Sequence, residues 1–436
     1  MDKAVFEKLK NSLCEFIRIP SVRGESVDGA LCGVECNRAL DFALNLGMEL
    51  GFSRSKNLDG LVGYLDVGDM EECFGILAHV DVVPAGEGWT HKPFGGEIID
   101  DKIYGRGAMD DKGPIVIILY AIHKLLQEGR VLKKRIRVIL GADEETGGNP
   151  KITAWESIDR YIQTEKLPDI GISPDADFPV INAEKGILNL KLSIKAPDCV
   201  ISANGGTASN VVPNKASITL RTGHELTIPQ EFAVEKTDTG IKISAFGKNA
   251  HGAKPYEGDN AITKLITGLS NENLDFSTLV DVYGSGLGVD MNDEVSGRLT
   301  VNVGTMEKVG EELVFVVNIR YPVSVKSNTV VEKIRKSWNG SVEVIKDSLP
   351  LYVPKEHYLV KTLLDSYNKV TGECGEPIAI GGGTYARALP LGVGFGIMFP
   401  NDVDTMHAPD ENISFTNIEK AFDIYYDAIK KLCFEE

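Results

Sequence analysis

The sequence predicts an α/β fold: a mostly parallel sheet flanked by helices, with a separate α+β domain inserted into it. Over residues 1–184, apolar β-branched runs alternate with amphipathic helical patterns. Over residues 185–353, strands with polar faces predominate, and over residues 354–436 the α/β pattern returns. We therefore expect a discontinuous first domain that is interrupted by the inserted one.

The first part of the chain alternates between the two periodicities. We expect helices at 2–18, 33–51, 114–128 and 151–165, strands at 61–66, 74–80, 135–142 and 169–173, and a hairpin over 96–104. Pro114 favours a helix start, because the first helical turn tolerates proline. The run RIRVILGA at 135–142 is apolar and β-branched, which is typical of a buried parallel strand.

The inserted domain and the last part follow the same reasoning. In the insert we expect strands within 187–222 and at 240–247, 298–305, 312–321 and 341–348, and helices at 259–270 and 327–338. After it we expect helices at 355–371 and 415–433 and strands at 376–380 and 393–398.

Bulk composition excludes several classes. The 436 residues are 43% hydrophobic and 25% charged, as in ordinary globular proteins. The formal net charge of -17 argues against nucleic-acid binding, which needs a basic surface. The longest apolar run is about nine residues, well short of the ~18 that suggest a membrane span, and the start lacks a signal-peptide pattern. Seven scattered cysteines suit a reducing cytosol, so we expect a cytoplasmic protein.

Polar side chains follow several expected strands at their carboxyl ends, where ligands of open α/β sheets bind. They are His79 and Asp81, Glu144 and Glu145, Asp175 and Asp177, and His407; Asp110 and Asp111 precede a helix. If these ends converge, several carboxylates crowd together and would be forced to take up protons. A divalent cation removes that conflict, and two cations share such a cluster when one carboxylate bridges them.

Each of these features alone has a simpler interpretation. His79 would be a core histidine, Asp143–Glu145 a solvated loop and Asp110–Asp111 a helix cap, so the joint pattern carries the prediction. Competing motifs are incomplete: GRGAMD lacks the third glycine of a dinucleotide loop, and no G-x-S-x-G occurs. Gly381–Gly383 lacks the lysine of a P-loop, but it suits either a substrate carboxylate, with Gly382 at its centre, or a simple turn.

Taken together, these motifs resemble the two-zinc family of glutamate carboxypeptidases, aminoacylases and dipeptidases, and most of all its bacterial broad-specificity dipeptidases. The matching stretches, from about Phe74 onward, are HVDVVP, YGRGAMDDKG, ADEETGG, SPDADFPVINAEKG, ASNVVP, NAHGAKP, GGGTYAR and MHAPDE. The resemblance implies that His79 and Asp175, with Asp177 as the alternative, hold one metal. Glu145 and His407 would hold the other.

The same resemblance implies the remaining roles. Asp110 would bridge the metals, Asp81 would orient His79, and Glu144 would be the general base. The inserted domain would be a lid. In it, His251 would stabilise the oxyanion unless it is a surface histidine.

Two further lid residues, Asn210 and Arg320, would bind the substrate carboxylate, with an internal ion pair as the alternative for Arg320. The insert is long, which favours a monomer over a dimer formed through the lid.

We therefore expect metal-dependent hydrolysis of dipeptides, in which Glu144 takes a proton from a water shared by two metals. Zinc is the expected metal, with manganese or cobalt as alternatives. The nearest rival is an N-acyl amino acid deacylase on the same scaffold. A non-catalytic metal- or peptide-binding protein is the rival from another class, and it would have no use for a base at Glu144.

Overall fold

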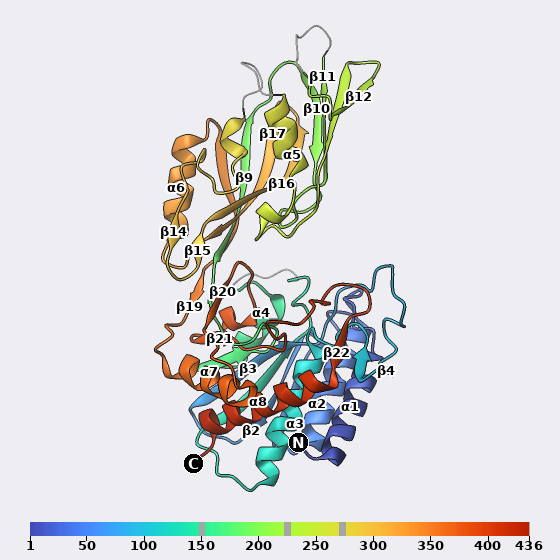
Figure 1. Ribbon diagram of the computed structural model, residues 1–436, viewed down its shortest axis with the longest axis vertical. Coiled ribbons are helices and arrows are strands. Elements are labelled where there is room, and N and C mark those ends of the chain that lie inside the picture. The colour runs from blue at the N-terminus through green and yellow to red at the C-terminus, as the bar shows by residue number, and fades with distance from the viewer. Residues whose placement is uncertain (148–152, 222–227, 270–275, 436) are drawn as a thin grey trace. The chain divides into compact units, whose positions relative to one another are not determined.

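The computed structural model describes residues 1–147, 153–221, 228–269 and 276–435 (Figure 1). The chain divides into two compact units. Unit 1 comprises Met1–Asn182, Val353–Ile378 and Gly383–Glu436, and unit 2 comprises Ala183–Tyr352 and Ala379–Gly382. The roles of the two units as catalytic domain and lid stay predictions.

Most strands of a nine-stranded sheet belong to unit 1. The sheet has the order β1-β2-β6-β3-β7-β21-β8-β19, with β20 paired to β8, and its strand β19 is assigned to unit 2. The strands are β1 Arg54–Leu58, β2 Val62–Val67, β3 Cys73–His79, β6 Arg135–Gly141, β7 Ile170–Ser173, β8 Ile181–Glu184, β19 Leu351–Tyr352, β20 Ile378–Ile380 and β21 Gly392–Gly394. The pairs β3–β6, β3–β7 and β7–β21 are parallel.

The α/β class is confirmed, but the sheet is mixed, and the parallel pairs β3–β6, β3–β7 and β7–β21 lie at its centre. The pairs β1–β2, β2–β6, β21–β8 and β8–β19 are antiparallel. The unexpected strand β1 shows why. It reaches β2 through a tight turn at Asp59 and Gly60, both with positive φ, and so short a connection can only join antiparallel strands.

Helices cover both faces of this sheet. The helices of unit 1 are α1 Lys3–Ile17, α2 Val34–Glu49, α3 Lys112–Gln127, α4 Glu156–Ile162, α7 Tyr358–Thr371 and α8 Phe415–Cys433, with the 3-10 helix η3 Tyr385–Ala388. Ile76 and Ala78 of β3 pack into the core with α1, α2, α3, α7 and α8, whereas Leu77 packs with α4 and η3. This alternation buries β3 on both faces, as expected of a central parallel strand.

A small sheet supports the edge of unit 1 at which the predicted site residues lie. It contains β4 Glu97–Ile99, β5 Lys102–Tyr104 and β22 Asn412–Ser414, in the order β22-β5-β4. The hairpin expected over 96–104 is β4 and β5, and its turn residues Asp100 and Asp101 both have positive φ.

Unit 2 is an α+β unit with an eight-stranded antiparallel sheet in the order β12-β13-β11-β10-β16-β17-β9-β18. Its strands are β9 Gly186–Lys195, β10 Val200–Gly205, β11 Lys215–Leu220, β12 Ala233–Lys236, β13 Ile241–Phe246, β16 Thr300–Val309, β17 Glu312–Tyr321 and β18 Ser341–Ser348. Helices α5 Ala261–Gly268 and α6 Ser327–Ser337 pack against it, and β14 Asn292–Asp293, β15 Gly297–Arg298, η1 Pro255–Glu257 and η2 Ser277–Leu279 complete the unit.

Several expected elements are shorter than predicted. The helix expected at 355–371 begins at Tyr358, because His357 caps its first turn by accepting a hydrogen bond from the Leu359 N–H. The strand expected at 393–398 is regular only over Gly392–Gly394, and Met398 adds an isolated parallel bridge to Asp177. The helices expected at 151–165 and 259–270, and the strands within 187–222, extend partly outside the described residues.

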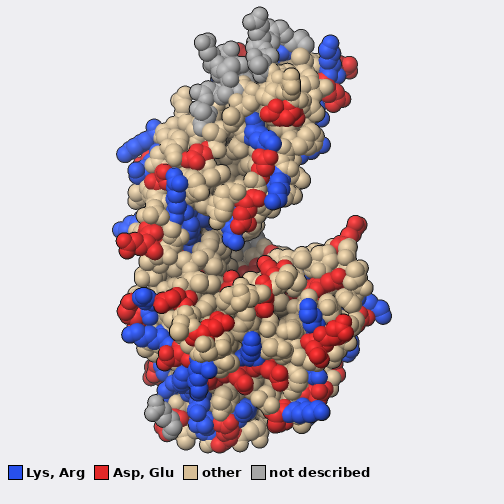
Figure 2. Space-filling model, in the orientation of Figure 1, with Lys and Arg blue, Asp and Glu red and all other residues tan. Residues whose placement is uncertain are grey.

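On the face drawn in Figure 2, Lys and Arg are interspersed with Asp and Glu in both units. Among the described residues, no helix combines the length and apolar character needed to cross a membrane.

Candidate metal centre

The sequence-predicted ligands of unit 1 come from the carboxyl ends of adjacent parallel strands. His79 is the last residue of β3, Glu144 and Glu145 follow β6, and Asp175 follows β7. Since β3 pairs in parallel with both β6 and β7, these ends meet at one edge of the sheet. Asp110 lies just before α3, and His407 lies in the loop between β21 and β22.

Asp110 lies between the two histidines and offers one oxygen to each. His79 Nε2 is 2.9 Å from Asp110 Oδ1, and His407 Nε2 is 2.8 Å from Asp110 Oδ2. Glu145 Oε1 is 3.0 Å from His407 Nε2, and Asp175 Oδ2 is 3.7 Å from His79 Nε2. A carboxylate with a histidine on each side is the arrangement expected of a ligand shared by two cations.

The protonation of His79 tests whether this site fits a metal. His79 Nδ1 is 3.0 Å from the Asp81 carbonyl oxygen, which can only accept, so Nδ1 carries the hydrogen. In the neutral ring, Nε2 is then an acceptor that faces another acceptor, Asp110 Oδ1. Both atoms are buried and neither has a hydrogen-bond partner. Only a positive charge between or on these atoms relieves that conflict, and a divalent cation fits the donor set.

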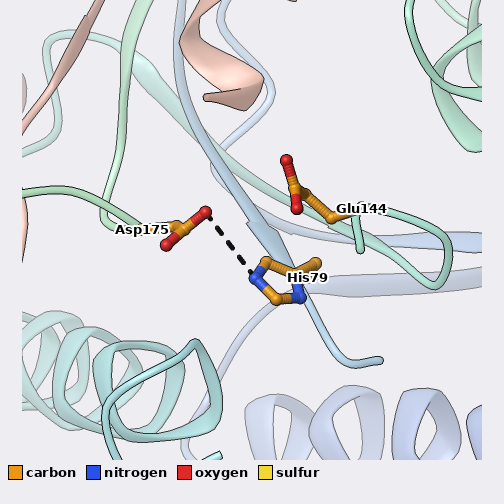
Figure 3. Close-up of side chains that lie close together, drawn as sticks. All are labelled: His79, Glu144 and Asp175. Carbon is orange, nitrogen blue, oxygen red and sulfur yellow. Dashed lines mark ion pairs between the residues drawn. The ribbon is translucent and has the colours of Figure 1, made fainter. Parts of the chain in front are cut away.

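Two groups of possible ligands result. His79, Glu144 and Asp175 present atoms within 4.8 Å of one another, and so do Asp110, Glu145 and His407. Figure 3 shows the first group, with the ion pair between His79 and Asp175 dashed and the Glu144 side chain beside them. Glu144 therefore lies in the same cluster as the expected ligands.

The pKa values of the clustered side chains are raised, which indicates an excess of negative charge. Burial, and then repulsion by Asp110, raise the pKa of Asp175 to about 7. Burial and the charge of Asp175 raise the pKa of Glu144 well above its usual value. Hydrogen bonds to Asp110 and Glu145 raise the pKa of His407 to about 11. In each case the positively charged or neutral form is favoured, as expected where carboxylates outnumber cations.

Three further acidic side chains accept hydrogen bonds from the backbone in and next to the cluster. Asp81, 1% exposed, accepts hydrogen bonds from the Glu144 N–H at 3.1 Å and the Glu145 N–H at 3.2 Å. Asp111 Oδ2 accepts from the backbone N–H of His79 at 3.1 Å. Asp143, next to Glu144, caps α4, and its Oδ1 also accepts from the hydroxyl of the buried Tyr385 at 3.2 Å. Of these four residues, the sequence reasoning gave a role only to Asp81.

Glu411 is a fourth acidic residue behind the cluster, and the sequence reasoning gave it no role. It is fully buried and accepts the Asp110 N–H at 3.3 Å. The signal was present in the MHAPDE motif, which combines His407 with an acidic residue four positions later. Its partners lie about three hundred residues away, so nothing local indicated that it would be buried.

The other predicted site residues, His251, Asn210, Arg320 and Gly382, belong to unit 2, and their roles stay predictions. His251 is exposed and forms an isolated bridge with Val211, beside Asn210. Arg320 is buried and donates to Asn318 Oδ1 at 2.8 Å and to the Gly381 carbonyl at 2.7 Å. Both of these acceptors are neutral, and an internal ion pair stays the alternative to substrate binding.

The glycine run 381–383 precedes the four-residue 3-10 helix η3, which is capped by Thr384, and both interpretations of the run stay predictions. Asp175, rather than the alternative Asp177, is the residue grouped with His79 in the described chain.

Known proteins resemble this chain in both sequence and structure. The model of "Peptidase family M20/M25/M40" matches residues 75–431. The Bacillus subtilis protein named "Putative dipeptidase YtjP" is 36% identical over 458 residues, which cover 98% of this chain and 97% of that protein. A Staphylococcus epidermidis protein named "Putative dipeptidase" is 36% identical over 476 residues, covering 100% and 98%.

Solved structures share the fold at lower identity. The M20 family metallo-carboxypeptidase Sso-CP2 of Sulfolobus solfataricus has a TM-score of 0.58 at 19% identity and covers 99% of each chain. The aminoacylhistidine dipeptidase of Vibrio alginolyticus has a TM-score of 0.56 at 14% identity, covering 100% of this chain and 98% of its own.

Proposed function

The chain belongs to peptidase family M20/M25/M40, and from that premise we propose that it is a dipeptidase that uses two divalent cations. The observation that carries this proposal is the position of Asp110, which faces His79 with one carboxylate oxygen and His407 with the other. Relatives at 36% identity over nearly the whole chain are named as dipeptidases, which supports the substrate class.

We assign the cations to two sets of side chains. His79 and Asp175 would hold one, Glu145 and His407 would hold the other, and Asp110 would serve both. When bound, such a pair lowers the pKa of a water and polarises the peptide carbonyl. Zinc is the metal we propose, because imidazole and carboxylate ligands suit it, with manganese and cobalt as the alternatives.

Glu144 is the proposed general base. It lies in the cluster, but its neighbour Glu145 contacts His407, so the two adjacent glutamates can take separate roles. Burial and the charge of Asp175 raise the pKa of Glu144, which makes its carboxylate a better proton acceptor. Glu144 takes the proton of the attacking water and delivers it to the leaving amine. Asp81 keeps the proton of His79 on Nδ1, so that Nε2 faces the cation position.

Unit 2 is proposed as a lid that supplies the remaining contacts. His251 would donate a hydrogen bond to the developing oxyanion, and Asn210, Arg320 and Gly382 would bind the terminal carboxylate of the peptide. Its length supports a monomer, because a long insert can supply the histidine from the same chain. The free cysteines support a reducing cytosol as its compartment.

The proposal is tested by restoring activity to chelated protein. Zinc, manganese and cobalt are added back in turn, and hydrolysis is measured on free-amine dipeptides and on N-acetyl amino acids. We expect turnover of dipeptides with two cations bound per chain. Preferential turnover of N-acetyl amino acids would make the protein a deacylase. Cation binding without hydrolysis of either class would make it a binding protein.

A further inference from the structure

Glu411 belongs to the loop that follows His407, and its side chain contacts the turn that carries Asp110. Its side chain is fully buried, and Oε1 accepts three backbone N–H groups, from Gly107 at 3.0 Å, Met109 at 2.9 Å and Asp110 at 3.3 Å. These residues form the turn that presents the Asp110 side chain. One carboxylate oxygen therefore holds three of the four backbone positions from residue 107 to residue 110.

Arg106 supplies the charge that allows this carboxylate to be buried. Its Nη1 donates to Glu411 Oε2 at 2.7 Å, and the Arg106 side chain is 2% exposed. The guanidinium also donates to the Ala85 carbonyl at 3.3 Å and lies over the ring of Trp89. Without this partner, a buried carboxylate would pay a large desolvation penalty.

The main chain of Glu411 belongs to the loop that presents His407. The Glu411 carbonyl accepts the Gly105 N–H at 2.8 Å, and the neighbouring Asp410 accepts the N–H groups of Thr90 and His91 at 2.9 and 3.0 Å. His407 has a φ of 59°, which non-glycine residues adopt uncommonly, so contacts elsewhere in the loop must hold this conformation.

We propose that Glu411 is a positioning residue for the metal centre. Its carboxylate fixes the turn of Asp110 relative to the loop of His407. The proposal rests on the proposed metal function. It explains why two ligands separated by almost three hundred residues can face each other at 2.8 Å. Removing the carboxylate should separate them while leaving both side chains present.

Glu411→Gln is the informative change. Glutamine has nearly the same size but only one acceptor oxygen, and its NH₂ must face either Arg106 or the three backbone N–H groups. Asp66→Asn is the matched control. Asp66 forms a similarly buried pair with Arg137, with contacts of 2.6 Å, between β2 and β6 and apart from the ligands.

Two measurements separate positioning from plain stability. Hydrogen exchange of metal-free protein reports whether residues 107–110 lose protection, and calorimetric titration with Zn²⁺ reports cation affinity. For Glu411→Gln we expect lost protection there, at least about tenfold weaker binding of a cation, and a lower kcat with KM nearly unchanged. For Asp66→Asn we expect a lower melting temperature with protection at 107–110 and Zn²⁺ affinity as in the wild type.

Glu411→Asp keeps the charge and withdraws it by one methylene, so it provides the test if Glu411→Gln does not fold. We expect its Zn²⁺ affinity to fall as well. Wild-type protection at 107–110 together with wild-type Zn²⁺ affinity, in a folded variant, would overturn the inference. Wild-type protein that binds no cation would refute the metal function, and the exchange measurement would still decide whether Glu411 holds the turn.

Discussion

Replacing Asp81 with asparagine should weaken cation binding, although Asp81 is not an expected ligand. Its carboxylate accepts the backbone N–H groups of Glu144 and Glu145, and its Oδ1 lies 3.4 Å from Nδ1 of His79. A single side chain therefore orients an imidazole and two acidic residues. The variant disturbs all three without removing any of them.

The size of the effect follows from hydrogen bonding. Asparagine fits the same space, but its NH₂ group must face one of the two backbone N–H donors. A buried donor left without an acceptor costs about 1–3 kcal/mol. At ~1.36 kcal/mol per factor of ten, this corresponds to roughly 5- to 160-fold. That range overlaps the ~10- to 100-fold loss typical when the outer partner of a metal-bound histidine is removed.

The assay is competition for Zn²⁺ with a chromogenic chelator, together with kcat/KM on one dipeptide. Asp427→Asn is a suitable control, because Asp427 is a buried carboxylate that accepts from Ser366 and Lys369 between α7 and α8. We expect it to lower the melting temperature only. If Asp81→Asn binds Zn²⁺ within twofold of wild type, the proposed role of Asp81 is wrong.

Three further predictions concern the chemistry. Glu144→Gln should lower kcat by ~10²- to 10⁴-fold with both cations retained, as measured by metal analysis; near-normal turnover would remove it as the base. His251→Ala should lower kcat by ~10²- to 10³-fold with little change in KM, and an unchanged kcat would exclude it from the mechanism. In metal-free protein, burial raises the pKa of Asp175 to about 7, and hydrogen bonds raise the pKa of His407 to about 11. Both folded values exceed the unfolded ones, so the stability that protonation provides is lost as pH rises through them. The melting temperature of metal-free protein should therefore fall as the pH rises from about 4 to about 11, the range between the unfolded pKa of Asp175 and the folded pKa of His407, and less so with Zn²⁺ bound; equal slopes would contradict this.

The sequence could predict which site residues lie at the ends of strands. His79 follows an apolar run, and Glu145 follows another, so their positions at the sheet edge depend only on strand periodicity and parallel pairing. Parallel pairing of central strands was predictable for the same reason, since apolar runs such as β6 require burial on both faces.

Long-range partners could not be predicted. Nothing in the sequence around Glu411 indicates that its partner is the distant Arg106. Tyr385, which donates to Asp143, lies in a motif that is equally typical of a simple turn. The edge strand β1 was missed as well. The RSKNL segment of β1 is mostly exposed and has no apolar periodicity to reveal it.

The arrangement of acidic groups explains why these missed residues matter. A cluster that includes Asp110, Glu145 and Asp175 is unfavourable without added positive charge, so local chain preference alone cannot hold it. The fold instead holds several of the proposed site residues through their backbone: Asp81 accepts the N–H groups of Glu144 and Glu145, and Glu411 accepts that of Asp110. Each of these buried carboxylates is satisfied by N–H donors, so the charge that remains unbalanced is that of the ligands. Cation binding then relieves a repulsion that folding has already set up.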